Sequence, residues 1–116
     1  MPEHDIVGRS LFATDCNSRD TDRALSVSGA SFTDNSAEYG GAIYNEYDAA
    51  ISDSTFTGNG AADGGALYDS WNTEVDTSVF SNNGAEYGGA IYTDDGVDTI
   101  ATSSFLNNGA DSGGGV

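Results

Sequence analysis

A repeat of about 24 residues constrains the fold of this chain more than any other feature. The octapeptide AEYGGAIY occurs at 37–44 and again, unchanged, at 85–92. Aligned on phenylalanine, the chain reads SFTDN, TFTGN, VFSNN and SFLNN, with the ring residues 24, 24 and 25 positions apart. Aligned on the glycine pair, it reads GGAIY, GGALY, GGAIY and a final GGGV at 113–116. Two independent motifs therefore report one period.

Each repeat predicts three short strands and no helix, because Gly, Asn and Asp interrupt it about every eight residues. Apolar residues alternate with polar ones, as in half-buried strands. Three apolar columns result, one for each strand, and we expect all three to point inward: Phe32, Phe56, Phe80 and Phe105; Ile43, Leu67, Ile91 and Val116; Val27, Ile51, Val75 and Ile100. Turn residues that tolerate positive φ lie between them.

These patterns predict an all-β fold, a right-handed parallel β-helix (a solenoid) of four to five coils with uncapped ends. Coils of such a fold stack about 4.8 Å apart, and handedness follows the rule for parallel crossovers. We expect one domain over 1–116, with an irregular N-terminal coil at 1–30 and the repeats at 31–116. Val7 or Ile6, Phe12 and Val27 would complete the core. The rival fold, a β-sandwich, gives no reason for strict repetition.

Stacking of the coils predicts two further features. Asparagines recur at one position, and we expect their amides to form a ladder between coils: Asn35, Asn59, Asn83 and Asn108. The glycine pair should supply a bend that a Cβ would obstruct.

Composition limits the partners of the chain. Nineteen acidic residues against three Arg give a formal net charge of −16, which repels nucleic acid and anionic lipid. No stretch approaches the roughly 18 apolar residues of a membrane span, so we expect no membrane insertion. The first thirty residues lack the apolar run of a signal peptide. The acid excess fits a high-salt habitat, divalent cation binding, or solubility alone.

The alternation of FxxN with GGA[IL] from about Ser31 to Val116 resembles the repeats of polymorphic outer membrane proteins. The proteins of this family are surface-exposed autotransporter passengers, so the resemblance implies a right-handed β-helix fold and a role in adhesion for this chain. We therefore expect an extracellular or cell-surface location. The leading functional hypothesis is a non-enzymatic structural repeat module. The alternative is an adhesin-like fragment that binds a carbohydrate or a surface receptor.

The ends of the chain suggest self-association. Open coil ends expose unpaired strand edges, and the final GGGV is a shortened repeat. Aligning Phe12 with Phe56 makes the interval from Phe105, through a join of Val116 to Met1, 23 residues. Head-to-tail stacking of copies into a filament follows as a hypothesis, with these residues at the contact: Val7, Ser10, Phe12, Gly113, Gly114, Gly115 and Val116.

A second candidate surface is the tyrosine column that follows the inward Ile/Leu column. Tyr44, Tyr68 and Tyr92, together with Trp71, should face outward and could contact a sugar ring or a protein. Mutual packing that stiffens the solenoid is the competing interpretation, and we favour it.

Catalytic and metal chemistry have little support in the sequence. We interpret the acids of the turns, Glu46, Asp48, Asp69, Asp94, Asp95 and Asp98, as a solvated face. Calcium is the only ion they suggest, and their positions drift between coils. Asp94 and Asp95 are adjacent, so on a strand they would point opposite ways and not converge as acid and base. His4 and Cys16 have no partner spacing. We expect no enzyme activity and no cofactor.

Overall fold

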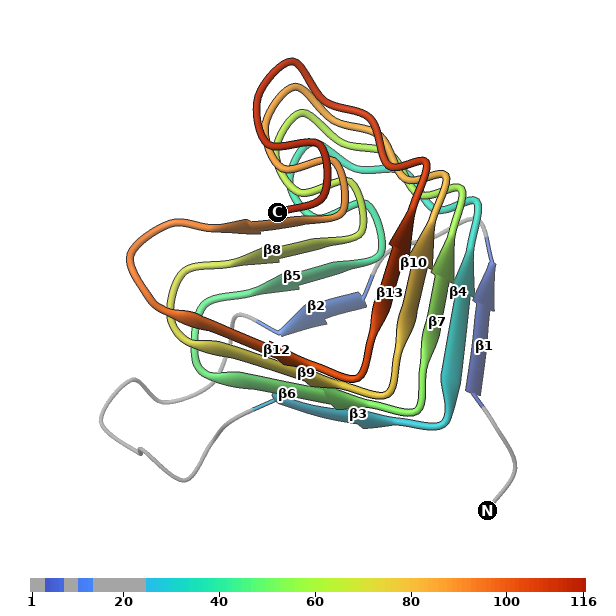
Figure 1. Ribbon diagram of the computed structural model, residues 1–116, viewed down its shortest axis with the longest axis vertical. Helices are drawn as coiled ribbons and strands as arrows, with labels where there is room; N and C mark the ends of the chain where they lie inside the picture. Colours follow the sequence, from blue (N-terminus) through green and yellow to red (C-terminus); the bar gives the residue numbers. More distant parts are fainter. Residues whose placement is uncertain (1–3, 8–10, 14–24) are drawn as a thin grey trace.

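The computed structural model describes residues 4–7, 11–13 and 25–116 of the chain. These residues form a parallel β-solenoid of three sheets, with a period of about 24 residues and about three turns. Viewed down the coil axis, the sheets make three sides of a triangle (Figure 1). A looped arm projects at one corner, and in successive coils it consists of residues 34–42, 58–66 and 82–90. The chain turns counterclockwise as successive coils approach the viewer, which is the right-handed sense (Figure 1). The parallel β-helix prediction is confirmed, with slightly fewer turns than the four to five expected.

Each sheet contains one strand type, and we name it after the apolar column that it carries. The phenylalanine sheet runs in the order β1 (His4–Val7), β4 (Ala30–Thr33), β7 (Thr55–Thr57), β10 (Val79–Ser81) and β13 (Ser104–Leu106). The isoleucine sheet runs β11 (Ile91–Thr93), β8 (Leu67–Asp69), β5 (Ile43–Asn45) and β2 (Leu11–Ala13). The valine sheet runs β12 (Asp98–Ala101), β9 (Thr73–Asp76), β6 (Ala49–Ser52) and β3 (Leu25–Ser28). The described residues contain no helix that could span a membrane.

The core is a set of one-residue-wide stacks, because parallel pairing in register places equivalent residues directly over one another. Phe32, Phe56, Phe80 and Phe105 stack with ring centroids 4.8, 4.6 and 4.8 Å apart and nearly parallel planes. In the inner coils the phenylalanine, isoleucine and valine columns are all buried in one hydrophobic cluster. The three predicted columns therefore point inward, as the alternation indicated.

Polar ladders and glycines shape the corners. Asn59 Nδ2 donates to Asn83 Oδ1 at 2.9 Å and to the Phe32 carbonyl at 3.1 Å, so the predicted asparagine ladder is confirmed. At the glycine pair, Gly64 has a φ of +68°, and a Cβ on Gly65 would lie 2.0 Å from the Gly89 carbonyl oxygen. The glycine pair thus provides both a left-handed residue and a close approach of backbones, as expected.

The predicted alignment of the first coil is wrong. Phe12 was aligned with Phe56, but β2 pairs with β5, so that Phe12 lies beside Tyr44 of the isoleucine sheet. Ile6 of β1 instead takes the phenylalanine position, paired with Phe32. Aromatic residues occur in an inward and an outward column, and only strand pairing distinguishes them. Three residues separate β1 from β2, whereas nine separate β4 from β5, so the first coil lacks the spacing that fixed the alignment elsewhere.

This correction removes one argument for a seamless head-to-tail join. Eleven residues lead from Phe105 to Val116 and six more from Met1 to Ile6, which makes an interval of 17 instead of 23. An interval of 17 falls well short of the 24-residue period, so a joined copy would not continue the solenoid in phase.

Candidate functional site

The tyrosine column is a stacked ladder on the outer face of the isoleucine sheet. Tyr44 and Tyr68 have ring centroids 5.2 Å apart, and Tyr68 and Tyr92 are 5.3 Å apart. All three rings are half-buried because each lies against the next one. The ladder therefore presents ring edges and hydroxyl groups to solvent more than ring faces. The structure brings these three predicted residues together, whereas no ring contact within residues 25–116 includes the exposed Trp71.

Acidic residues accompany this ladder. The Tyr44 hydroxyl donates to Glu46 Oε2 at 2.8 Å, and this hydrogen bond, with burial and the Glu46 charge, raises the pKa of Tyr44 to about 12. Burial, followed by the charge of Asp94, raises the pKa of Tyr68. Both phenols therefore remain neutral hydrogen-bonding groups at physiological pH.

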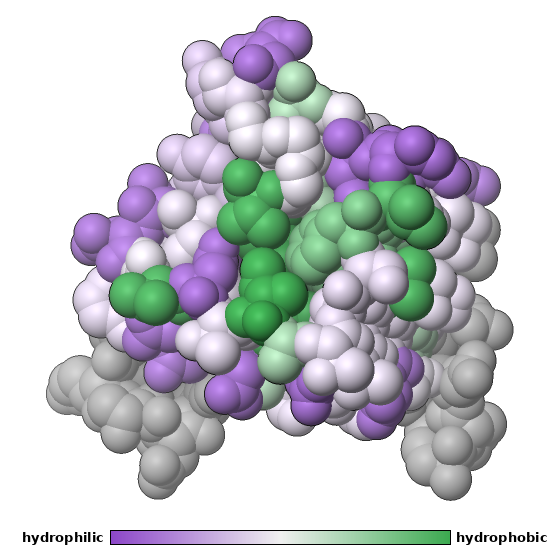
Figure 2. All heavy atoms as spheres, in the orientation of Figure 1, coloured by the Kyte–Doolittle hydropathy of each residue, from purple (hydrophilic) through white to green (hydrophobic). Residues whose placement is uncertain are grey.

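The coil end that carries β11, β12 and β13 exposes apolar residues that the inner coils bury. Ile100 is 38% exposed, although its equivalents Val75 and Ile51 are 0% and 2% exposed. Val116 is 48% exposed, and Phe105 is only partly buried. Figure 2 shows hydrophobic residues gathered in the middle of this end, with polar residues around them.

The predicted contact residues divide between the two ends of the solenoid. Gly113 and Gly115 belong to the last coil, where their carbonyls accept hydrogen bonds from Gly89 and from Ala90 and Ile91. Gly114 lies between them, and Val116 follows. Val7 lies on β1 and Phe12 on β2, which are the outermost strands at the opposite end. Ser10 and Cys16 lie outside the described residues.

Asp69 is buried, so its assignment to a solvated acidic face is wrong. It follows Tyr68 on β8 and is 0% exposed. Thr73 Oγ1 donates to Asp69 Oδ2 at 2.7 Å, and Asn45 Nδ2 donates to Asp69 Oδ1 at 3.0 Å. Burial raises the pKa of Asp69 from 3.8 to about 6, although these hydrogen bonds lower it. Strand alternation gave the signal for burial, because this residue is two positions after the inward Leu67.

The other acids of the turns do not gather into a metal site. Within the described part of the chain, no three His, Cys, Asp or Glu side chains lie close enough together to hold an ion. Asp98 accepts a hydrogen bond from Thr93, and Glu46 accepts one from Tyr44. Asp94 and Asp95 are exposed on the turn before β12.

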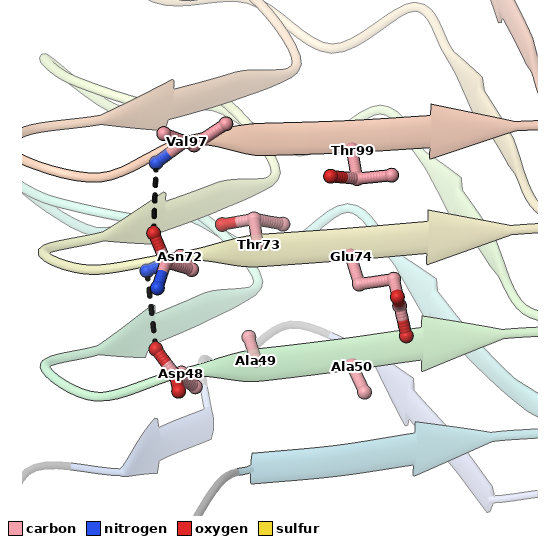
Figure 3. A pocket seen from close by; sticks show the side chains of 8 residues that line it. All are labelled: Asp48, Ala49, Ala50, Asn72, Thr73, Glu74, Val97 and Thr99. Carbon is pink, nitrogen blue, oxygen red and sulfur yellow. Dashed lines mark hydrogen bonds between the residues drawn. The ribbon is translucent and has the colours of Figure 1, made fainter.

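A shallow hollow of about 470 Å³ lies on the valine sheet (Figure 3). At its edge, Asp48 Oδ1 accepts from the Asn72 backbone at 3.3 Å, and Asn72 Oδ1 accepts from the Val97 backbone at 3.0 Å. Two of its polar side chains therefore link neighbouring coils. Outward-facing Glu74 lies between the smaller Ala50 and Thr99 (Figure 3), and this difference in side-chain size accounts for the hollow.

Comparisons with known proteins identify the repeat. Residues 29–46, 53–70 and 77–94 match the family described as Chlamydia polymorphic membrane protein (Chlamydia_PMP) repeat. Each matched segment contains a phenylalanine strand, the arm and the following isoleucine strand. No curated protein and no solved structure matches the chain. The resemblance drawn from the FxxN and GGA[IL] motifs is confirmed.

Proposed function

We propose that this chain, which carries three repeats of the polymorphic membrane protein type, is a non-enzymatic structural module of a surface or extracellular assembly. The repeat family supports a surface-associated module. The hydrogen bonds of the asparagine ladder, the stacked rings and the close glycine contacts are all directed between coils. Most of the recurring residues are thus explained by stacking of the solenoid on itself.

The second part of the proposal is that the exposed coil end binds a second copy of the chain. The observation that carries it is the exposure of Ile100, compared with complete burial of Val75 one coil away. β11, β12 and β13 are the last strands of their sheets. Strand edges with unpaired N–H and C=O groups beside apolar side chains are the usual template for adding another strand.

The pairing register determines how such copies would meet. If β1 of the next copy stacks on β13, both strands belong to the phenylalanine sheet, and Ile6 continues the column of Phe105. The positions above β11 and β12 then remain to be filled, because β1 precedes β2 and β3 along the chain. Head-to-tail association would therefore be a non-covalent contact through one sheet, and it would propagate as a filament.

Sedimentation equilibrium over a wide concentration range tests this proposal. High salt should strengthen association, because it screens repulsion between chains of net charge −16. We expect the unaltered chain to form species larger than a monomer, whereas Ile100→Lys should sediment as a monomer. A lysine there can extend through the open end of the coil, so the fold should persist. Val116→Lys offers a second test that leaves the core unchanged.

Val79→Lys is the matched control. Val79 is exposed on β10, an inner strand of the phenylalanine sheet, where it pairs with Thr55 on one side and Ser104 on the other, so it is not at the coil end. This variant should associate like the unaltered chain. A monomer at every concentration and salt level would refute the proposal, as would equal association of Val116→Lys and Val79→Lys. Electron micrographs with discrete pairs, and no filaments, would contradict the head-to-tail arrangement.

A second candidate function is adhesin-like binding of a glycan or a receptor at the tyrosine ladder. Two further tyrosines support it, since Tyr39 and Tyr87 are 42% and 46% exposed beside the ladder. Retention on immobilised glycans should then be lost in Tyr68→Ala without a change in molecular mass. Equal retention of the unaltered chain and the Tyr68→Ala variant would exclude glycan binding at the tyrosine ladder.

A further inference from the structure

The tyrosine-bearing arm is interrupted in its middle repeat. The first and third repeats carry Glu38–Tyr39 and Glu86–Tyr87, whereas the second carries Ala62–Asp63. β-bridges pair Tyr39 with Asp63 and Asp63 with Tyr87, so these three residues lie in consecutive coils at one position. The change removes two large side chains and places a carboxylate between Tyr39 and Tyr87.

Two aromatic residues flank this carboxylate. Tyr39 and Tyr87 are two coils apart, which corresponds to about 10 Å at the strand spacing of about 4.8 Å. The Tyr39 ring packs edge-on against Tyr68, with centroids 5.4 Å apart, and Tyr68 stacks on Tyr92 at 5.3 Å. Asp63 therefore lies between two positions that carry exposed tyrosines.

The Asp63 carboxylate has no counterion among residues 25–116. Its side chain forms no hydrogen bond or ion pair with the described residues, whereas backbone bonds hold its main chain, such as the Gly40 N–H to the Asp63 carbonyl at 2.9 Å. Residues 25–116 contain no Lys, Arg or His, because the three arginines are Arg9, Arg19 and Arg23. No side chain of residues 25–116 can therefore supply a cation at this position.

We propose that Asp63, Tyr39 and Tyr87 form a binding site for a guanidinium group, presented by an arginine side chain of a partner. A cation is attracted to an aromatic ring within about 6 Å of its centroid, and Tyr39 and Tyr87 occupy the equivalent positions in the coils on either side of Asp63. Guanidinium suits this arrangement better than ammonium, because it is planar, stacks on rings and pairs with a carboxylate through two hydrogen bonds.

A hard divalent cation fits this position less well. Calcium requires six to eight oxygen ligands, and the position between Tyr39 and Tyr87 offers one carboxylate. Neighbouring Glu38 and Glu86 add negative charge that attracts a cation without being needed as ligands. The site is on the lateral face of the solenoid, so this inference goes beyond the proposed structural role and does not depend on association through the coil end.

A pair of matched peptides tests the proposal in the intact chain. Acetyl-Gly-Arg-Gly-amide supplies the guanidinium, and the same peptide with citrulline has the same shape without the charge. At low ionic strength, NMR titration should shift the ring signals of Tyr39 and Tyr87 with the arginine peptide and not with the citrulline peptide. Absence of shifts at these rings with the arginine peptide would overturn the site.

Variants separate this site from general attraction by an acidic protein. Asp63→Asn should weaken binding of the arginine peptide about tenfold. Asp63→Tyr, which restores the residue of the first and third repeats, should abolish binding at the Tyr39 and Tyr87 rings. Asp53→Asn removes the same charge from an exposed turn between β6 and β7 and should bind like the unaltered chain. Equal weakening by Asp63→Asn and Asp53→Asn, or no weakening by Asp63→Asn, would refute the proposal.

Discussion

Asn59 Oδ1 accepts two hydrogen bonds from Asn35 in the coil below, one from the backbone N–H at 3.0 Å and one from Nδ2 at 2.9 Å. The same asparagine donates from its own backbone and Nδ2 to Asn83 Oδ1, each at 2.9 Å. One buried side chain thus joins three coils, and the asparagine recurs in each repeat because stacking places every copy on the next.

Replacing Asn59 by alanine should lower the free energy of unfolding by about 3 kcal/mol or more. Several buried groups, including the Asn35 amide, would lose their partners, and each unsatisfied buried group costs about 1–3 kcal/mol. Urea unfolding followed by circular dichroism measures this loss. Thr57→Ala is the control, because it removes a 3.2 Å bond to Ser81 on the outer face and should cost less than about 1 kcal/mol. Equal losses in the two variants would contradict the importance of the ladder.

The repeat period and the alternation of inward and outward residues along each strand suffice to predict most of the fold. Phenylalanine, isoleucine and valine columns recur in phase, so parallel stacking leaves their orientation little freedom. The same alternation predicts that Asp69 is buried, although its charge led to the opposite interpretation. The first coil could not be aligned in this way, because Leu11–Phe12 matches the inward–outward pattern of Ile43–Tyr44 as well as Phe12 matches a core phenylalanine.

The candidate surfaces were less predictable, because they depend on which repeated residues cover one another. The tyrosine column was expected to face outward and to pack on itself, and it does both, but Trp71, which was expected beside it, makes no ring contact within residues 25–116. Exposure of Ile100 depends on its place in the last coil, since the same column is buried at Val75. Single positions within a repeat acquire different surroundings according to the coils above and below.

Gly65→Ala should destabilise the solenoid by about 3 kcal/mol, because the added Cβ would lie 2.0 Å from the Gly89 carbonyl oxygen and neither backbone can move freely. Gly60→Ala provides a close control, since a Cβ there comes no nearer than 3.6 Å to the Gly84 oxygen. The control should change the unfolding free energy by less than about 1 kcal/mol. Thermal and urea denaturation measure the stability of the two variants. Similar stabilities of Gly65→Ala and Gly60→Ala would show that the glycine pair is not needed for close stacking of the coils.

The pKa of Asp69 predicts how stability depends on pH. The folded value of about 6 exceeds the ordinary value of 3.8, so the folded state binds more protons between these two values. The contribution of Asp69 to the free energy of unfolding therefore falls as pH rises from about 4 to 6, by at most about 3 kcal/mol. Above about pH 7, where Asp69 is ionised in both states, this contribution should be constant.

Asp69→Asn isolates this effect, because without a charge its amide oxygen can still accept from Asn45 Nδ2 and its amide nitrogen can donate to Thr73 Oγ1. The variant should gain stability relative to the unaltered chain as pH rises from 4 to 7. Asp53→Asn, at an exposed turn, should follow the pH profile of the unaltered chain more closely. Parallel profiles for the Asp69→Asn variant and the unaltered chain would show that Asp69 does not titrate in this range.

The most direct test of the proposed role is hydrogen exchange at the coil end. Amides of β13 that no neighbouring strand pairs should exchange rapidly in dilute solution. As concentration and salt rise, β1 of a second copy covering this edge should slow exchange there, while exchange in β7 and β8 of the inner coils stays unchanged. Rapid exchange at β13 under every condition would contradict the account, because it would leave the apolar end of the solenoid without the partner that we propose.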